Sequence, residues 1–410
     1  MKKKIFISIA IVLLLVAVAL WGYLFFVKPP AGNGDLSGLP IGGSSGASSE
    51  QDANRAGGNE QSTTTILPKP LRQLTTRAVA GATFTESGVR FMERGTGHIF
   101  DINLLTGAET QVTNTTLAGV VTADFSPSTN RVLFGVPQDD TASFSVGTIT
   151  RGDDGGGTVT GFGLPTGAHE VAFTPSGEAV FYVLDGANGA VGYQYTIASE
   201  ASEQLFSVPI RDIRVLWGNA IYVYPAPTAA QPGSVYRARG DTLEYVTGSA
   251  YGLTATAFTG GLVVSYTDSA SQWGVGTYIK IGTSTQPLGI PLLADKCAQQ
   301  ALGDSVLYCA ATPSPERGTY PDDWYKGLVS FDDALWELAP SAGSALLLSN
   351  FKEESGRQID ATKLVTDRAG ERISFINKID TTLWIFDTTL VVQPTTDTGN
   401  AASSTESATN

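Results

Sequence analysis

The segment VAFTPSGEAVFYVL, residues 171–184, places a turn signal between two apolar runs. Thr174, Pro175, Ser176 and Gly177 are typical turn residues, since proline fixes its own φ and glycine accepts a positive φ without steric cost. Residues 171–173 and 179–184 on either side are rich in valine and aromatic residues, which favour strands. The segment therefore predicts one β-hairpin.

Similar hairpins recur along the chain between residues 71 and 388. Most of their turns lie 41 to 48 residues apart, and one interval is 67 residues. The turns fall at Gly88, Thr129, Gly177, Gly218, Gly260, Gly303 and Gly370. Because a four-stranded propeller blade takes about 40 to 50 residues, the repeat predicts an all-β, seven-bladed β-propeller.

The third and seventh blades show how the ring is expected to be built. The third blade divides into four strands, at residues 169–173, 179–184, 190–197 and 204–208. The seventh has only three, at residues 362–365, 373–376 and 383–386. Residues 71–76 have the character of a fourth strand and precede the first blade. We expect this N-terminal strand to close the ring, because closure removes an exposed sheet edge.

Several of these repeats carry a family resemblance. Phe125-Ser126-Pro127 and Phe173-Thr174-Pro175-Ser176-Gly177 each lead into an apolar strand, and Gly97-His98-Ile99-Phe100-Asp101-Ile102-Asn103 is followed by Thr106-Gly107 and Gln111-Val112-Thr113. These segments resemble the WD-repeat-like blades of TolB-type propellers. The resemblance implies a propeller fold and a role in binding, and it implies no particular reaction.

The N-terminal region predicts a membrane anchor. Residues 5–27 are 23 consecutive uncharged, mostly apolar residues, which as a helix would span about 35 Å and cross a bilayer core of about 30 Å. A cleaved signal peptide is the alternative, but its apolar core is usually only about 7 to 15 residues long. The expected organisation is a stub at 1–4, a transmembrane helix at 5–27, a flexible linker at 28–66, the propeller at 67–394 and a disordered tail at 395–410.

Charge sets the compartment and excludes one class of partner. Lys2, Lys3 and Lys4 precede the apolar run, so the positive-inside rule keeps the N-terminus cytoplasmic and places the propeller on the extracytoplasmic side of the cell membrane. The whole chain has a formal net charge of -13. Nucleic acid is therefore not an expected partner, because phosphate binding needs a basic field.

Strand direction sorts the loops between two faces of the expected ring. Strands alternate in direction within a blade, so the connections from second to third strand share one face with the connections between blades. We call this the long-loop face, because its loops include 137–142, 185–189, 225–233, 267–274 and 312–327. The other connections are mostly short, and they form the tight-turn face.

The longest insertion, residues 312–327, is the candidate binding site. It combines aromatic side chains with paired acids and a base, which a peptide or glycan site would use. The candidate residues are Arg317, Tyr320, Asp322, Asp323, Trp324 and Tyr325. The alternative is that the three aromatic residues pack the loop onto its own blade.

The two cysteines are a disulfide candidate. Cys297 and Cys309 lie six residues on either side of Gly303, so a symmetric hairpin would place them opposite each other. Export would allow oxidation, and two buried thiols are the alternative. Two cysteines alone are too few for a structural zinc site, and His98 and His169 are the only histidines that could join them, so no metal and no cofactor are expected.

We therefore expect a membrane-anchored scaffold that binds a protein or glycan of the cell envelope and is not an enzyme. The alternative is an exported hydrolase or lyase acting on polysaccharide. Its carboxylates would come from residues near the first strand of each blade, where Glu170, Asp212 and Asp295 lie. Three acids without a supporting motif assign no catalytic residue.

Overall fold

The computed structural model describes residues 69–138, 141–152, 156–300 and 306–391. These ranges all belong to one compact unit, Ile66–Asn410. The segments predicted as membrane helix, linker and tail lie outside the described residues. Within the described ranges, no helix is both long enough and apolar enough to span a membrane.

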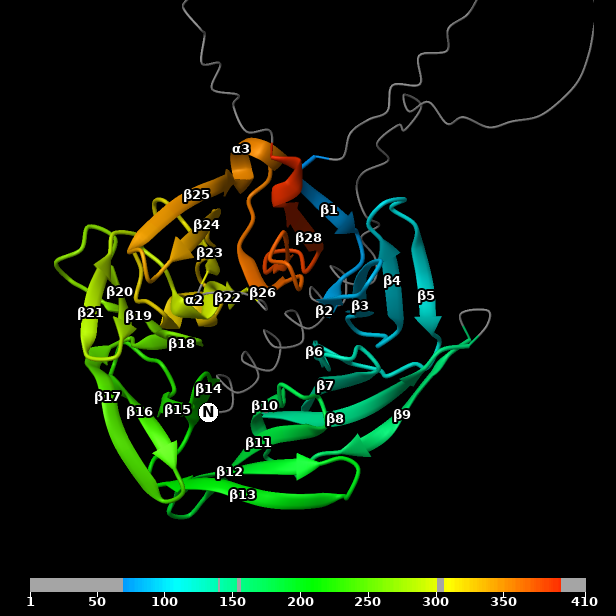
Figure 1. Cartoon of the computed structure of the whole chain (residues 1–410), viewed down its shortest axis with the longest axis horizontal. Helices are drawn as coiled ribbons and strands as arrows, with labels where there is room; N and C mark the ends of the chain where they lie inside the picture. Colours follow the sequence, from blue (N-terminus) through cyan, green and yellow to red (C-terminus); the bar gives the residue numbers. More distant parts are fainter. Residues whose placement is uncertain (1–68, 139–140, 153–155, 301–305, 392–410) are drawn as a thin grey trace, which may run out of the picture. The chain divides into compact units, whose positions relative to one another are not determined.

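The strands of the described residues form seven four-stranded sheets, or blades, arranged as a ring (Figure 1). The first three blades are β2–β5 (Val79–Phe84, Gly88–Glu93, Ile99–Asn103, Glu109–Thr113), β6–β9 (Thr122–Phe125, Arg131–Gln138, Thr141–Thr150, Thr158–Gly163) and β10–β13 (His169–Phe173, Ala179–Gly186, Gly189–Thr196, Ala201–Val208). The next three are β14–β17 (Ile213–Trp217, Ile221–Pro225, Pro232–Arg239, Thr242–Tyr251), β18–β21 (Thr254–Phe258, Gly261–Thr267, Val275–Ile281, Ser284–Leu288) and β22–β25 (Cys297–Gln299, Leu307–Ala311, Ala334–Ala339, Ser344–Asn350). The seventh contains β26–β28 (Ala361–Thr366, Arg372–Asn377, Leu383–Asp387) and β1 (Leu71–Thr75).

The hairpin of residues 171–184 is confirmed as β10 and β11, the two inner strands of the third blade. Its turn is closed by a hydrogen bond from the Gly177 N–H to the Thr174 carbonyl oxygen (2.8 Å). Gly177 has a φ of 71°, which explains the glycine at this position. The first five residues of β11 are buried, as expected for a strand covered on both faces by neighbouring sheets.

The seventh blade draws its strands from both ends of the propeller. β1 pairs antiparallel with β28, placing Leu71 opposite Phe386 and Gln73 opposite Trp384. Leu71 is buried in a core cluster with Trp384 and Phe386. At the tight-turn face, the Asp387 N–H donates to the Pro70 carbonyl oxygen (2.9 Å).

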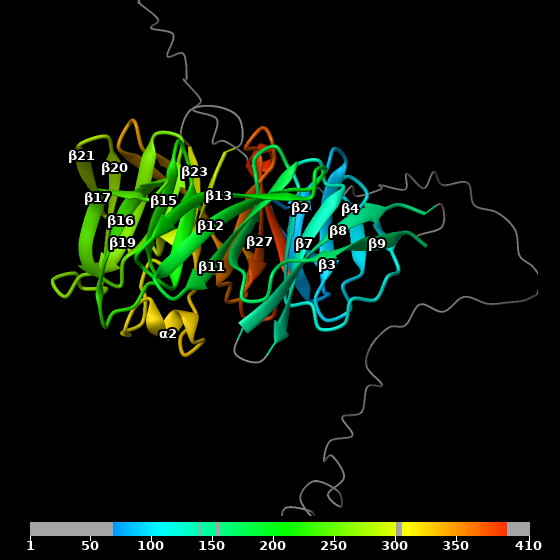
Figure 2. The same ribbon diagram turned by 90° about the horizontal axis from the view of Figure 1, so that it is seen from below.

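Short helices also occur, although the sequence shows almost no helical periodicity. α2 (Asp322–Tyr325) belongs to the long connection between β23 and β24. In Figure 2 it projects from one face of the ring. The other elements are α3 (Phe351–Ser355), between β25 and β26, and the 3-10 turns η1 (Ala294–Lys296) and η2 (Thr388–Leu390).

The two cysteines lie on neighbouring strands of the sixth blade. Cys297 begins β22 and is directly opposite Cys309 of β23. Their sulfur atoms are joined in a disulfide across a Cα–Cα distance of 4.1 Å. The predicted turn at Gly303, which connects these strands, lies outside the described residues.

Candidate functional site

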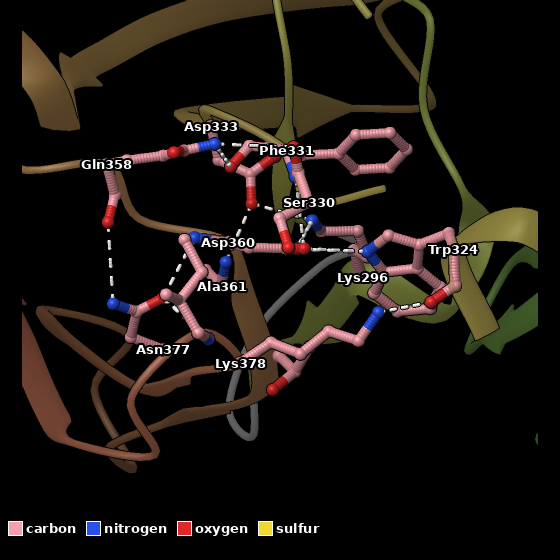
Figure 3. A network of polar contacts seen from close by, with 12 residues as sticks. Lys296, Trp324, Ser330, Phe331, Asp333, Gln358, Asp360, Ala361, Asn377 and Lys378 are labelled. Atoms are coloured by element: carbon pink, nitrogen blue, oxygen red, sulfur yellow. Dashed lines mark hydrogen bonds and ion pairs between the residues drawn. The ribbon is translucent and has the colours of Figure 1, made fainter. Parts of the chain in front are cut away.

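The long loop of the sixth blade is fixed by a buried ionic network (Figure 3). Lys296 of η1 donates hydrogen bonds to Asp333 Oδ2 and to Asp360 Oδ1, each at 2.6 Å. Asp360 also accepts a hydrogen bond from Trp324 Nε1 of α2 (2.9 Å to Oδ2) and from the Phe331 N–H (3.0 Å). The network therefore connects the second half of the β23–β24 connection to the connection that precedes β26.

Aromatic packing completes this anchor. Tyr320, Trp324 and Phe331 are each at least 94% buried and form one cluster with Val275 and Leu293. The Trp324 and Phe331 rings stack at a centroid distance of 6.0 Å. The position of Tyr320 and Trp324 favours the packing role that the sequence left open as the alternative, because a ligand cannot reach buried rings.

The network brings like charges close together in the interior. The side chains of Lys296, Asp333 and Asp360 are all at most 1% exposed. Asp333 Oδ1 has no hydrogen-bond partner among the described residues. Burial raises the pKa of Asp333 to about 6, against the attraction of Lys296. The folded protein therefore holds a proton on this carboxyl at a pH where the unfolded chain releases it.

This raised pKa predicts a pH dependence of stability. The contribution of Asp333 to the free energy of unfolding is fully present below the ordinary carboxyl pKa of about 4. It is lost as the pH rises through about 6. We expect the wild type to lose about 1 kcal/mol of unfolding free energy between pH 5 and pH 7 relative to Asp333→Asn, which does not titrate. Urea unfolding of both proteins at the two pH values measures this. If the difference in unfolding free energy between the two proteins is the same at both pH values, the prediction is wrong.

The loop also contacts blades other than its own. Thr228 Oγ1 and the Ala229 N–H, both in the β15–β16 connection, donate to the Asp322 carboxylate at 3.0 and 2.6 Å. Thr267 of β19 donates to the Tyr320 carbonyl oxygen (2.8 Å). Together with Asp360 of the seventh blade, these contacts hold the loop against blades four, five and seven, so it is a rigid part of the long-loop face.

The anchored loop places Tyr325 in a polar cluster at the inner side of the ring. Tyr325 donates a hydrogen bond to Asp295 of η1. Arg214 of β14 forms an ion pair with Glu170 of β10 (2.7 Å), and the Val215 N–H donates to the other Glu170 oxygen (2.9 Å). Burial, followed by the charge of Asp295, raises the pKa of Tyr325, so its hydroxyl remains a donor.

Solvent reaches the inner side of the ring. The first strand of each blade lies nearest the centre in Figure 1. Although these strands are central, three charged residues on or next to them are exposed: Asp124 of β6, Lys363 of β26, and Asp295 just before β22. We call this solvent-reached space the axial opening. Burial by the surrounding protein still raises the pKa of Asp124 and lowers that of Lys363 to about 8.

Two residues of the axial opening have unusual backbone conformations. Glu170 and Lys363 have φ values of 49° and 50°, a region that residues other than glycine seldom adopt. Each lies where the strand register shifts, between His169 and Ala172 or between Thr362 and Val365. Lys363 Nζ donates to the Ala80 carbonyl oxygen (2.8 Å). These bulges turn charged side chains toward neighbouring inner strands.

The other residues predicted for the binding site or for the alternative function do not all lie in one cluster. Arg317 is exposed on the loop, and Asp323 accepts a hydrogen bond from the Thr319 N–H (2.7 Å) within the loop itself. Asp212 is exposed and donates its backbone N–H to Asp185 (3.1 Å). Of the carboxylates named for the alternative function, Glu170 and Asp295 share the polar cluster with Tyr325 and Arg214.

The basic residues of these sites were not among the predicted site residues. Lys296, Arg214 and Lys363 lie in or next to the first strands of blades six, four and seven. A charged residue within such an apolar segment was the available signal, because a side chain on an innermost strand can only face the axis or a neighbouring sheet. Across the described ranges, no cluster of histidine, cysteine and acidic residues could hold a metal ion.

Comparison with known proteins assigns this chain to no family. No family model matches the chain, and neither does any curated protein. The β-propeller domain of the trilobed protease from Pyrococcus furiosus is 11% identical, with a TM-score of 0.49, over 76% of this chain and 95% of that one. An oligogalacturonate lyase from Vibrio parahaemolyticus is also 11% identical, with a TM-score of 0.45, over 77% and 93%. Acylaminoacyl peptidase from Pyrococcus horikoshii is 12% identical, with a TM-score of 0.45, over 73% of this chain and only 49% of that one.

These observations define the class of protein: the chain has a seven-bladed β-propeller fold. Identities of 11 to 12% say nothing about its activity.

Proposed function

We propose that this protein is a membrane-anchored, exported propeller of the TolB-like kind that binds a protein or glycan of the cell envelope at its long-loop face. The observation that carries the proposal is the anchored loop, which holds Tyr325 beside Asp295 where solvent reaches the ring. Recognition sites work best when rigid elements present aromatic and charged groups together. The expected partner is this envelope protein or glycan, and its binding requires no cofactor.

The direction of β1 supports the orientation of this site. β1 begins at the tight-turn face, where Pro70 lies beside Asp387 at the end of β28. A tether that precedes β1 would leave the propeller from that face. The long-loop face, with α2, would then point away from the membrane. In the same proposal, the pairing of β1 with β28 closes the ring.

Substitution of Tyr325 tests the binding role. Its side chain is 39% exposed, and we expect Tyr325→Ala to weaken binding about tenfold or more, as loss of a central aromatic contact does. The measurement is co-sedimentation of the detergent-solubilised chain with isolated envelope material. Tyr325→Phe keeps the ring and should bind better than Tyr325→Ala.

The matched control is Leu105→Ala. Leu105 is 95% exposed in the turn between β4 and β5, on the tight-turn face. This change should leave binding intact. Equal loss in both alanine variants, or no loss in Tyr325→Ala, would contradict a site at the long-loop face.

The alternative is a hydrolase or lyase that acts on polysaccharide, and one observation favours it. Burial raises the pKa of Asp295, which lies in the polar cluster with Glu170, and raised carboxyl pKa values suit general acids. Release of new reducing ends or unsaturated sugars from envelope polysaccharide would support it. The binding role instead predicts intact polysaccharide after prolonged incubation.

A further inference from the structure

A hollow opens between the inner strands of blades two, three and four. It has a volume of about 310 Å³, which is at the lower end of the range for pockets that hold small ligands. Its walls come from β6, β7 and β8 of the second blade and from β10 and β14 of the next two. β10 is half-buried along its whole length, in contrast to the fully buried start of β11. The hollow therefore lies beside the hairpin that is most regular in the sequence.

Aromatic side chains form much of its apolar wall. Phe134, Phe144 and Trp217 line the hollow from three different strands. Trp217 packs edge-on against Phe181 at a centroid distance of 5.0 Å, which fixes the indole ring. Trp217 Nε1 is buried and has no hydrogen-bond partner among the described residues. Trp217 as a whole is half-buried, so part of it is open to the hollow.

The charged groups of the hollow are nearly balanced. Asp124 and Glu170 line it, but Glu170 is paired with Arg214 at 2.7 Å. Lys363 is close enough to act on Asp124 electrostatically, and it donates to Thr122 of the same wall (2.5 Å). A second cation would be repelled by Lys363, and an anion would be repelled by Asp124. The balance favours an uncharged, polar ligand.

We propose that the hollow binds one neutral sugar ring of a glycan, with Asp124 accepting hydrogen bonds from its hydroxyl groups and Trp217 contacting its apolar C–H surface. Aromatic walls next to fixed polar groups suit a sugar ring, which has apolar faces and a polar edge. This inference rests on the proposed function and narrows its ligand to a glycan. Glu170, which belongs both to the hollow and to the polar cluster of Arg214, Asp295 and Tyr325, connects the two parts of the site.

Calorimetric titration of the full chain in detergent tests this proposal. The neutral probes are tetrasaccharides of glucose, mannose, xylose and N-acetylglucosamine. The charged probes are the galacturonic acid tetramer and the deacetylated tetramer of N-acetylglucosamine. We expect at least one neutral probe to bind, both charged probes to bind more weakly, and the affinity for the neutral probe to change little with salt concentration.

Two variants locate the sugar. Asp124→Asn keeps the shape of the side chain and should weaken binding roughly tenfold, because hydrogen bonds to charged acceptors are the stronger ones. Trp217→Phe keeps an aromatic ring but offers the sugar a smaller apolar surface, so it should also weaken binding. Tyr245→Ala, at a 58% exposed residue of the outer strand β17, is the matched control and should bind as the wild type does.

The inference is overturned if no neutral probe binds, if a charged probe binds more tightly, or if Asp124→Asn and Trp217→Phe both bind normally. Its failure can be distinguished from failure of the proposed function. If envelope material binds in a Tyr325-dependent way but the neutral probes do not, the inference fails and the binding role stands. If neither the envelope material nor any neutral probe binds, both the inference and the proposed binding role are wrong.

Discussion

Replacing Lys296 with Met is expected to lower the free energy of unfolding by about 3–5 kcal/mol, the usual cost of removing one partner from a buried ionic group. Lys296 is the cation between Asp333 and Asp360, and all three side chains are at most 1% exposed. Without it, two carboxyl groups remain buried side by side. Urea unfolding at pH 7 measures the effect.

Two further variants separate the buried charge from general effects of losing a lysine. Lys352 makes an ion pair of similar length with Asp332 (2.7 Å), but its side chain is 65% exposed. Lys352→Met should therefore cost at most about 1 kcal/mol. The double variant K296M/D333N should recover part of the loss, because it removes one of the unpaired carboxylates. If Lys296→Met is as stable as Lys352→Met, the network does not anchor the loop.

Removing β1 is expected to have the other large effect. A chain that begins at residue 67 keeps β1, and a chain that begins at residue 77 loses it. The second chain exposes the edge of β28 and loses the buried contacts of Leu71 with Trp384 and Phe386. We expect a loss of at least about 3 kcal/mol, a large share of the 5–15 kcal/mol that stabilises a typical domain.

Thermal unfolding compares the two truncated chains. The chain that begins at residue 67 should melt at the temperature of the full chain. The chain that begins at residue 77 should melt well below that temperature or aggregate through the open edge of β28. A synthetic peptide of residues 67–77, added in trans, should restore part of the loss. Identical melting of both truncated chains would show that β1 does not close the ring.

The propeller was predictable because its information is local. The Thr174–Gly177 turn and the apolar strand that follows it are set by residues adjacent in the chain, and their repetition gave the number of blades. The predicted strands of the third blade agree with β10–β13 to within a few residues. The segment 71–76 could be recognised as a strand by its likeness to other fourth strands, although its partner β28 lies at the other end of the propeller.

The candidate site was predictable only in outline. The loop at 312–327 stood out by its length and composition, but the burial of Trp324 depends on Asp360, 36 residues further along the chain. Lys296 and Asp360 are separated by 64 residues. A local sequence pattern does not predict contacts between residues so far apart in the chain. The cluster of Arg214, Glu170, Asp295 and Tyr325 likewise forms only when blades three, four and six meet at the centre of the ring.

Site-specific photo-crosslinking in intact cells tests whether the long-loop face carries the binding site. A benzophenone amino acid replaces Tyr325 in one variant and Leu105 in the other, because these residues are exposed on opposite faces of the ring. Benzophenone reacts with C–H bonds of both proteins and glycans. We predict a defined adduct with an envelope component at position 325 and none at position 105. An adduct at position 105 alone, or equal adducts at both positions, would show that the long-loop face is not the specific binding site.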